Sequence, residues 1–73
     1  MKANIHGYLM DGEFLQDCGT DYTFFHLPAD DERTNLPELL KAVQEGVLTK
    51  VYKSVGGGQW VVMVKTSDIV WEA

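Results

Sequence analysis

The sequence predicts an α+β domain in which one helix packs on antiparallel strands. Three observations indicate this class: apolar residues alternate in several short runs, helical spacing occurs in one segment, and turn residues separate the runs. With 73 residues and 45% hydrophobic side chains, the chain has the size of a single domain, residues 1–73. A core this small excludes a two-domain architecture and an enzyme with a large cleft.

Strand signals dominate the first part of the chain. Residues 3–10 alternate loosely and are expected to form a strand. Asp11-Gly12 then predicts a type I′ hairpin turn, because both central positions of that turn need positive φ, which Asp and Gly tolerate. The second strand of this hairpin follows the turn at 13–15. A third strand is expected at 22–27, which is rich in aromatic and β-branched residues, and Pro28 ends it.

One helix is predicted after the polar connection at 29–34. Asn35 can cap it, Pro37 falls in the first turn, where no N–H is needed, and Gly46 stops it. Four apolar residues with helical spacing form one stripe, namely Leu36, Leu39, Leu40 and Val43. A helix this short needs to dock that stripe on a sheet.

Two more strands are expected at 47–55 and 59–65, on either side of Gly56-Gly57-Gly58. The density of β-branched residues marks 59–65 as the most buried strand and the centre of the sheet. Residues 69–71 are short enough for an edge strand or a single docking turn. The predicted order is therefore β-β-β-α-β-β, with 69–71 as an optional sixth strand.

This order is compatible with more than one architecture. It matches the five-stranded oligonucleotide/oligosaccharide-binding (OB) barrel, with its helix between the third and fourth strands. A β-grasp-like arrangement of two hairpins and a crossing helix fits almost as well, and so does an open sheet covered by one helix. We therefore expect a small antiparallel sheet or a partly closed barrel packed by one helix.

Negative charge is concentrated in the first two-thirds of the chain. Residues 11–45 hold nine carboxylates against two cations, a formal charge of −7, whereas residues 46–73 hold three lysines against two carboxylates. The total of −5 disfavours binding to phosphate backbones and anionic membrane surfaces, because like charges repel. No apolar run approaches the roughly 18 residues of a membrane span.

No group of reactive side chains forms a recognisable catalytic or metal motif. His6, Cys18 and His26 lack the short paired spacing of zinc ligands. A nucleophilic Cys18 would also lack a cationic neighbour to lower its pKa. Gly56-Gly57-Gly58 opens no helix and so does not form a phosphate-binding loop. We expect no enzymatic activity, no metal and no cofactor.

The acidic segments and the aromatic residues are the candidates for binding another protein. Asp30-Asp31-Glu32 lacks the alternating ligands of a calcium loop, but its carboxylates could steer a basic partner. Eight large aromatic residues exceed what so small a core readily encloses, so some are expected to be exposed as interface anchors. The predicted partner-binding residues are Asp11, Glu13, Asp30, Asp31, Glu32, Tyr8, Tyr22, Tyr52 and Trp71.

These features predict a non-enzymatic protein that binds a basic surface on another protein and thereby inhibits or regulates it. Proteins that handle nucleic acid are one class with such a surface. In size and charge the chain is similar to small acidic phage-type inhibitors, including many anti-CRISPR proteins. We expect a cytoplasmic location, because residues 1–7 lack the apolar stretch of a signal peptide.

Two alternatives stay open. An OB-like barrel could bind single-stranded nucleic acid or another ligand through stacking aromatics, provided that Lys50, Lys53 and Lys65 line one groove. The chain could also be an immunity factor or a subunit of an obligate complex.

Overall fold

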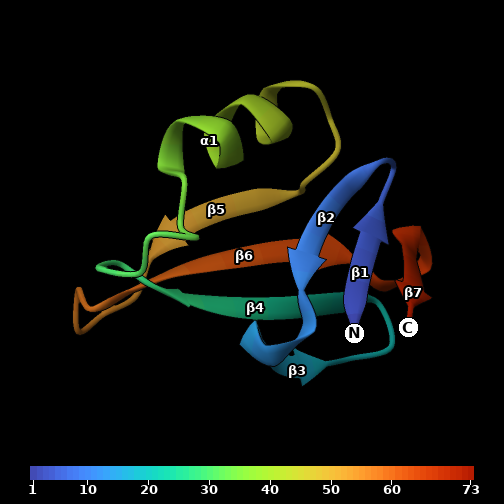
Figure 1. Cartoon of the computed structure of the whole chain (residues 1–73), viewed down its shortest axis with the longest axis horizontal. Coiled ribbons are helices and arrows are strands. Elements are labelled where there is room, and N and C mark those ends of the chain that lie inside the picture. The colour runs from blue at the N-terminus through green and yellow to red at the C-terminus, as the bar shows by residue number, and fades with distance from the viewer.

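Two antiparallel sheets and one helix make up the computed structural model, which describes residues 1–73 (Figure 1). The three-stranded sheet has the order β2 (Tyr8–Asp11), β1 (Lys2–Ile5), β7 (Ile69–Glu72). The four-stranded sheet has the order β3 (Leu15–Cys18), β4 (Tyr22–Pro28), β6 (Gln59–Lys65), β5 (Lys50–Lys53). The helix is α1 (Leu36–Gln44), and two short 3₁₀ turns are η1 (Gly12–Phe14) and η2 (Thr66–Asp68).

The α+β class is confirmed, and every pair of neighbouring strands is antiparallel. The strands do not close into a barrel, because they divide into two separate sheets. The two hairpins of the β-grasp-like alternative, β1–β2 and β5–β6, also lie in different sheets. Of the three arrangements that we considered, the open one is nearest to the structure, with a second sheet added.

The first hairpin turn lies five residues earlier than predicted. β1 and β2 are joined by His6 and Gly7, whose φ angles of 51° and 94° are both positive, as a type I′ turn requires. The Gly7 N–H also donates to the Asn4 side-chain oxygen at 2.8 Å. A side-chain hydrogen bond and the sheet register therefore hold His6 in a backbone region that non-glycine residues rarely adopt.

Asp11-Gly12, the predicted turn, instead begins η1. The Asp11 carboxylate accepts a hydrogen bond from the Glu13 N–H at 3.1 Å and so caps the 3₁₀ turn. A Cβ atom on Gly12 would lie 2.6 Å from the Met1 carbonyl oxygen. Glycine is needed here because two backbone segments approach closely, and the hairpin prediction at this dipeptide was wrong.

The later strands follow the prediction more closely. β6 lies inside the four-stranded sheet and pairs with β4 along its full length. β7 is an edge strand that pairs with β1, so the edge-strand reading of 69–71 is confirmed. β5 is shorter than the predicted 47–55, although Leu48 just before it is 2% exposed and belongs to the core.

The helix also begins and ends as predicted, but its buried face differs. The Asn35 side chain caps the first turn, and Gly46 ends the helix with a φ of 79°. Leu39 and Ala42 are buried, whereas Leu40, which we placed on the apolar stripe, is 48% exposed. The helix is rotated so that a small alanine faces the core. None of the helices has the length and apolar character that a membrane-spanning segment requires.

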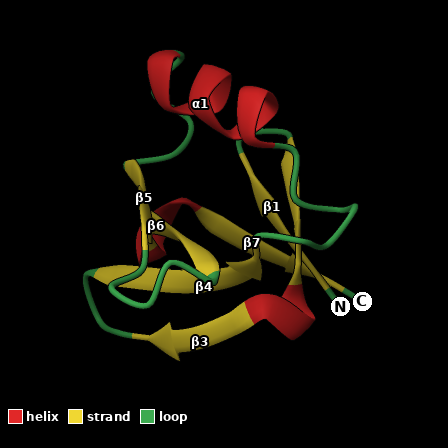
Figure 2. Ribbon diagram, turned by 90° about the vertical axis from the view of Figure 1, so that its left-hand side faces the viewer, coloured by secondary structure: helices red, strands yellow, loops and turns green.

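The core lies between the four-stranded sheet on one side and α1 with the three-stranded sheet on the other (Figure 2). From the four-stranded sheet, alternate residues of β4 and β6 point into it. The core residues are Ala3, Ile5, Met10, Phe25, Leu27, Leu39, Ala42, Leu48, Val62 and Val64. The residues between these in β4 and β6 point to the opposite face of the sheet.

Candidate functional site

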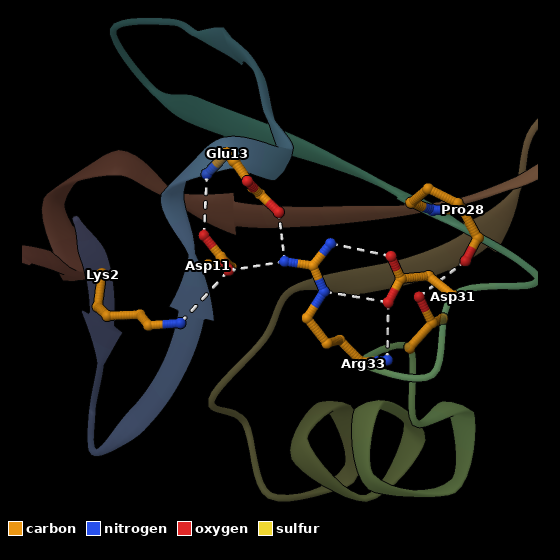
Figure 3. A network of polar contacts seen from close by, with 7 residues as sticks. Lys2, Asp11, Glu13, Pro28, Asp31 and Arg33 are labelled. Carbon is orange, nitrogen blue, oxygen red and sulfur yellow. Dashed lines mark hydrogen bonds and ion pairs between the residues drawn. The ribbon is translucent and has the colours of Figure 1, made fainter.

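Carboxylates from two distant segments meet around Arg33 (Figure 3). The Nη1 atom of Arg33 donates to Asp11 Oδ2 at 3.1 Å and to Glu13 Oε1. Its Nε and Nη2 atoms donate to the two carboxylate oxygens of Asp31 at 3.1 and 2.9 Å. Lys2 lies on the other side of Asp11, at 3.4 Å. One guanidinium thus joins the loop after β4 to the end of β2 and to η1.

The fold of the loop itself positions Arg33. The Thr34 hydroxyl donates to the Pro28 carbonyl at 2.8 Å, and the Asp31 N–H donates to the same oxygen at 3.2 Å. The Asp31 carboxylate also accepts from the Arg33 N–H at 2.8 Å. The guanidinium carbon lies 4.6 Å from the centre of the Phe14 ring, within range of a cation–π contact. These local bonds turn the Arg33 side chain towards η1.

The same contacts hold two of the carboxylates in their charged form. Hydrogen bonds from the side chain and backbone of Arg33 lower the pKa of Asp31 to about 2. The pKa of Asp11 is also lowered, mainly by the hydrogen bond from the Glu13 N–H, with Lys2 contributing next. The pKa of Arg33 is raised by its bonds to Asp31 and Glu13. The ion pairs therefore persist throughout the neutral range.

We define the acidic surface as these residues together with the two exposed neighbours of Asp31: Lys2, Asp11, Glu13, Asp30, Asp31, Glu32 and Arg33. Arg33 brings together three of the five predicted partner-binding carboxylates, those of Asp11, Glu13 and Asp31, and with Asp30 and Glu32 the surface holds five carboxylates against two cations, a formal charge of −3. Asp30 and Glu32 are exposed and take part in none of the chain's ion pairs. They are the carboxylates of this surface that stay free to pair with another molecule.

The predicted aromatic anchors divide into two pairs. Tyr22 and Tyr52 are 40% and 39% exposed, but they lie on the four-stranded sheet, on the face that points away from the core. Trp71 is half-buried, with its ring centre 6.3 Å from that of Phe25. Tyr8 is half-buried too, and burial raises its pKa. Tyr8 and Trp71 are therefore less exposed than we predicted, because both pack against the core, and their role as anchors stays a prediction.

Tyr8 is nevertheless the aromatic candidate that lies beside the acidic surface. A hollow of about 130 Å³ is lined by Tyr8, Leu9, Phe14 and Arg33, among others. Our reading of the sequence missed the roles of Lys2, Phe14 and Arg33. One signal was present, since Arg33 is the single arginine of the chain and follows directly after three acidic residues.

The histidines and the cysteine weighed as zinc ligands lie apart. His6 is 3.4 Å from Asp68 at the first hairpin turn. Cys18 lies on the core side of β3, where its sulfur is 3.7 Å from the Thr23 hydroxyl, and His26 lies on the opposite face of that sheet, 3.3 Å from Gln59. No group of three or more His, Cys, Asp or Glu side chains is arranged to hold a metal ion.

The lysines required by the nucleic-acid alternative do not line one groove. Lys50 and Lys65 lie on the face of the four-stranded sheet that points away from the core. Lys53 faces the other way, with its ammonium 5.7 Å from the Trp60 ring centre. Comparison with known proteins adds no assignment, since no family model, no curated protein and no solved structure matches this chain.

Proposed function

We propose that the protein is a non-enzymatic binding module that contacts a basic surface on another protein through its acidic surface, and thereby inhibits or regulates that protein. One observation carries this proposal. Three carboxylates from segments about 20 residues apart in the chain, those of Asp11 and Glu13 and that of Asp31, come together around a single arginine, and Asp30 and Glu32 flank Asp31 in the sequence. Dispersed carboxylates would keep a small protein soluble equally well, whereas a gathered set creates a local field that can steer a cationic partner.

The arrangement suits fast and selective association. Asp11 and Asp31 are fixed by Arg33, so part of the surface is ordered before a partner arrives. Asp30 and Glu32 are unpaired and supply the charge that a basic partner meets first. Such rim charges act mainly on the association rate and on the choice of partner. The half-buried Tyr8 and Phe14 beside them offer apolar contact area.

Charge reversal tests this function. We would use wild-type protein, an Asp30→Lys/Glu32→Lys variant and a matched Asp21→Lys/Glu45→Lys variant as baits for affinity capture from the native host, followed by mass spectrometry. All four positions are exposed, and both double variants change the formal charge by the same amount. We expect one stoichiometric partner to be retained by the wild type and the control and lost with the Asp30/Glu32 variant. With the purified partner, the association rate of that variant should fall about tenfold or more at low salt. Equal rates for the two double variants would refute the role of the acidic surface.

Two further measurements separate the alternatives. Titration with fluorescent single-stranded DNA at low salt should show no binding, whereas binding that weakens steeply with salt would support the nucleic-acid alternative. A subunit of an obligate complex would co-purify with its partner at every salt concentration. A steered regulator should instead associate more slowly as ionic strength rises, because salt screens exposed charges.

A further inference from the structure

The four-stranded sheet has a second apolar face that no other element covers. We define the outer face as the side of β4, β6 and β5 that points away from the core, together with the adjoining edge of β3. Val61 lies on it and is 3% exposed, although it is not part of the core cluster. It pairs with His26 on one side and Tyr52 on the other, so its own sheet neighbours shield it. Phe24 and Met63 complete the apolar part of the face.

One row of the outer face has opposite charges at its two ends. Across the sheet the register runs from Asp17 on β3 to Phe24 on β4, then to Met63 on β6, and ends at Lys50 on β5. Directly paired residues share a face, so these four side chains stand in line. Two contacts support this orientation. Lys50 Nζ is 5.4 Å from the ring centre of Tyr52, which lies on the outer face. Cys18, which follows Asp17 in β3, has its sulfur 3.7 Å from the Thr23 hydroxyl and therefore points to the core side.

We propose that the outer face is a symmetric dimer interface, occupied by a second copy of this chain. A two-fold axis in the interface, parallel to the strands and between β4 and β6, exchanges the two ends of each row. Asp17 of one copy then lies opposite Lys50 of the second copy, and Lys50 lies opposite Asp17 of the second copy. Phe24 and Met63 meet between these two ion pairs. A surface that is complementary to itself in this way is what a two-fold interface requires.

The neighbouring row fits the same operation. Tyr22 pairs with Lys65 across β4 and β6, so the axis brings each tyrosine ring opposite the lysine of the second copy. Two sheets that pack face to face leave about 10 Å between them and cross at roughly −30°. The long lysine side chains can absorb the few ångströms by which that angle displaces the ends of a row.

A second copy suits this face better than other occupants. A nucleic acid would bring phosphates against Asp17, and a basic protein would leave Lys50 and Lys65 facing like charges. Four strands of up to seven residues offer a face of about 19 Å by 24 Å, so a dimer would bury roughly 900 Å² in total. This area is below the roughly 1,200–2,000 Å² of stable specific interfaces, so we expect a weak dimer that forms only as the concentration rises. It shares no residue with the acidic surface.

The oligomeric state of the full chain tests the proposal. In sedimentation experiments the wild-type mass should rise from 8.2 kDa towards twice that value with increasing concentration. Asp17→Lys alone and Lys50→Asp alone each place like charges at both ends of the row. Each variant should therefore raise the dissociation constant of the dimer about tenfold. A mixture of these two single variants pairs only opposite charges. It should form a heterodimer at concentrations where each variant alone is monomeric, and the double variant should recover wild-type dimerisation.

Matched substitutions on α1 control for net charge. Glu45→Lys and Lys41→Asp make the same charge changes at exposed positions outside the outer face, and they should leave dimerisation unchanged. Circular dichroism melts would verify that all variants fold. A wild-type chain that stays monomeric up to about 1 mM, or a mixture of charge variants that stays monomeric, would overturn the proposal. So would Lys50-dependent binding of single-stranded DNA by the monomer. None of these outcomes bears on capture of a basic partner by the acidic surface.

Discussion

Val62 and Val61 are neighbours in β6 and are almost equally buried, yet they point to opposite faces of the four-stranded sheet. Val62 belongs to the core and is enclosed by α1 and the three-stranded sheet. Val61 is enclosed by side chains of its own sheet. Burial on the inner face therefore depends on how separate elements pack, whereas burial on the outer face depends only on strand pairing. Low exposure alone does not reveal which side chains hold the fold together.

Two adjacent phenylalanines should show the largest difference between these faces. Phe25 points to the core and is fully buried, whereas Phe24 is half-buried on the outer face. Phe25→Ala should lower the free energy of unfolding by about 3–5 kcal/mol, because it leaves a cavity between packed elements. Phe24→Ala should lower it by about 1 kcal/mol, because little besides its sheet neighbours contacts the ring. Urea unfolding of both variants at low protein concentration measures the difference. Equal losses would mean that the outer face is part of the core.

A buried hydrogen-bond pair on the inner face should show the next largest effect. Thr23 is fully buried, and its hydroxyl is 2.8 Å from that of Thr66, which donates its own proton to the Gly19 carbonyl and so accepts from Thr23. Thr66→Val leaves the Thr23 hydroxyl with only a weak sulfur contact and should cost about 1–3 kcal/mol of stability. Ser67→Ala, at the exposed next position, should change stability by less than about 0.5 kcal/mol. If the two variants unfold at the same urea concentration, the hydrogen bond between Thr23 and Thr66 contributes nothing to stability.

The fold could be predicted where the signals are local. Asn35 and Gly46 bound the helix through caps made by residues close in sequence, and the β-branched run at 59–65 identified the central strand. The prediction of the first hairpin turn was wrong because the glycine of Asp11-Gly12 is required by a contact that is not local in sequence. Gly12 is needed by the approach of Met1, and the Asp-Gly pair therefore resembled a turn that forms instead at His6.

The candidate site could be predicted only in part, and for a related reason. The charge count identified the five carboxylates, but it could not show that Arg33 joins residues about 20 positions apart. Exposure of aromatic residues depends on the face that each strand turns outward. Tyr22 and Tyr52 were placed correctly as exposed, whereas Trp71 lies in an edge strand whose inner side packs on Phe25. Alternation within a strand does not tell which of its sides meets the core.

Replacing Arg33 tests how much the exposed ion pairs of the acidic surface contribute to stability, relative to the Thr23–Thr66 hydrogen bond. The Arg33 side chain is about half exposed, and solvent screens its ion pairs, so Arg33→Gln should reduce stability less than Thr66→Val does. The same change makes the surface more negative and should speed association with a cationic partner severalfold at low salt. Lys41→Gln removes one positive charge from α1, where Lys41 makes no ion pair. This variant should change neither the stability nor the association rate. A larger loss of stability than for Thr66→Val would make the Arg33 network a main structural support.

The smallest effect is the dependence of stability on acidic pH, which comes from the lowered pKa values of the acidic surface. The pKa of Asp31 is about 2 in the folded chain, below the ordinary value of 3.8. A lowered folded pKa stabilises the fold above the ordinary value, and that stabilisation is lost as the pH falls from about 4 to about 2. The wild type should therefore unfold more easily across this window. Asp31→Asn should reduce the slope, because residue 31 then takes up no proton and only Asp11 keeps a lowered pKa, whereas Asp30→Asn should keep the wild-type slope, because Asp30 makes no ion pair. Identical slopes for all three proteins would show that solvent and counterions already replace the bonds from Arg33.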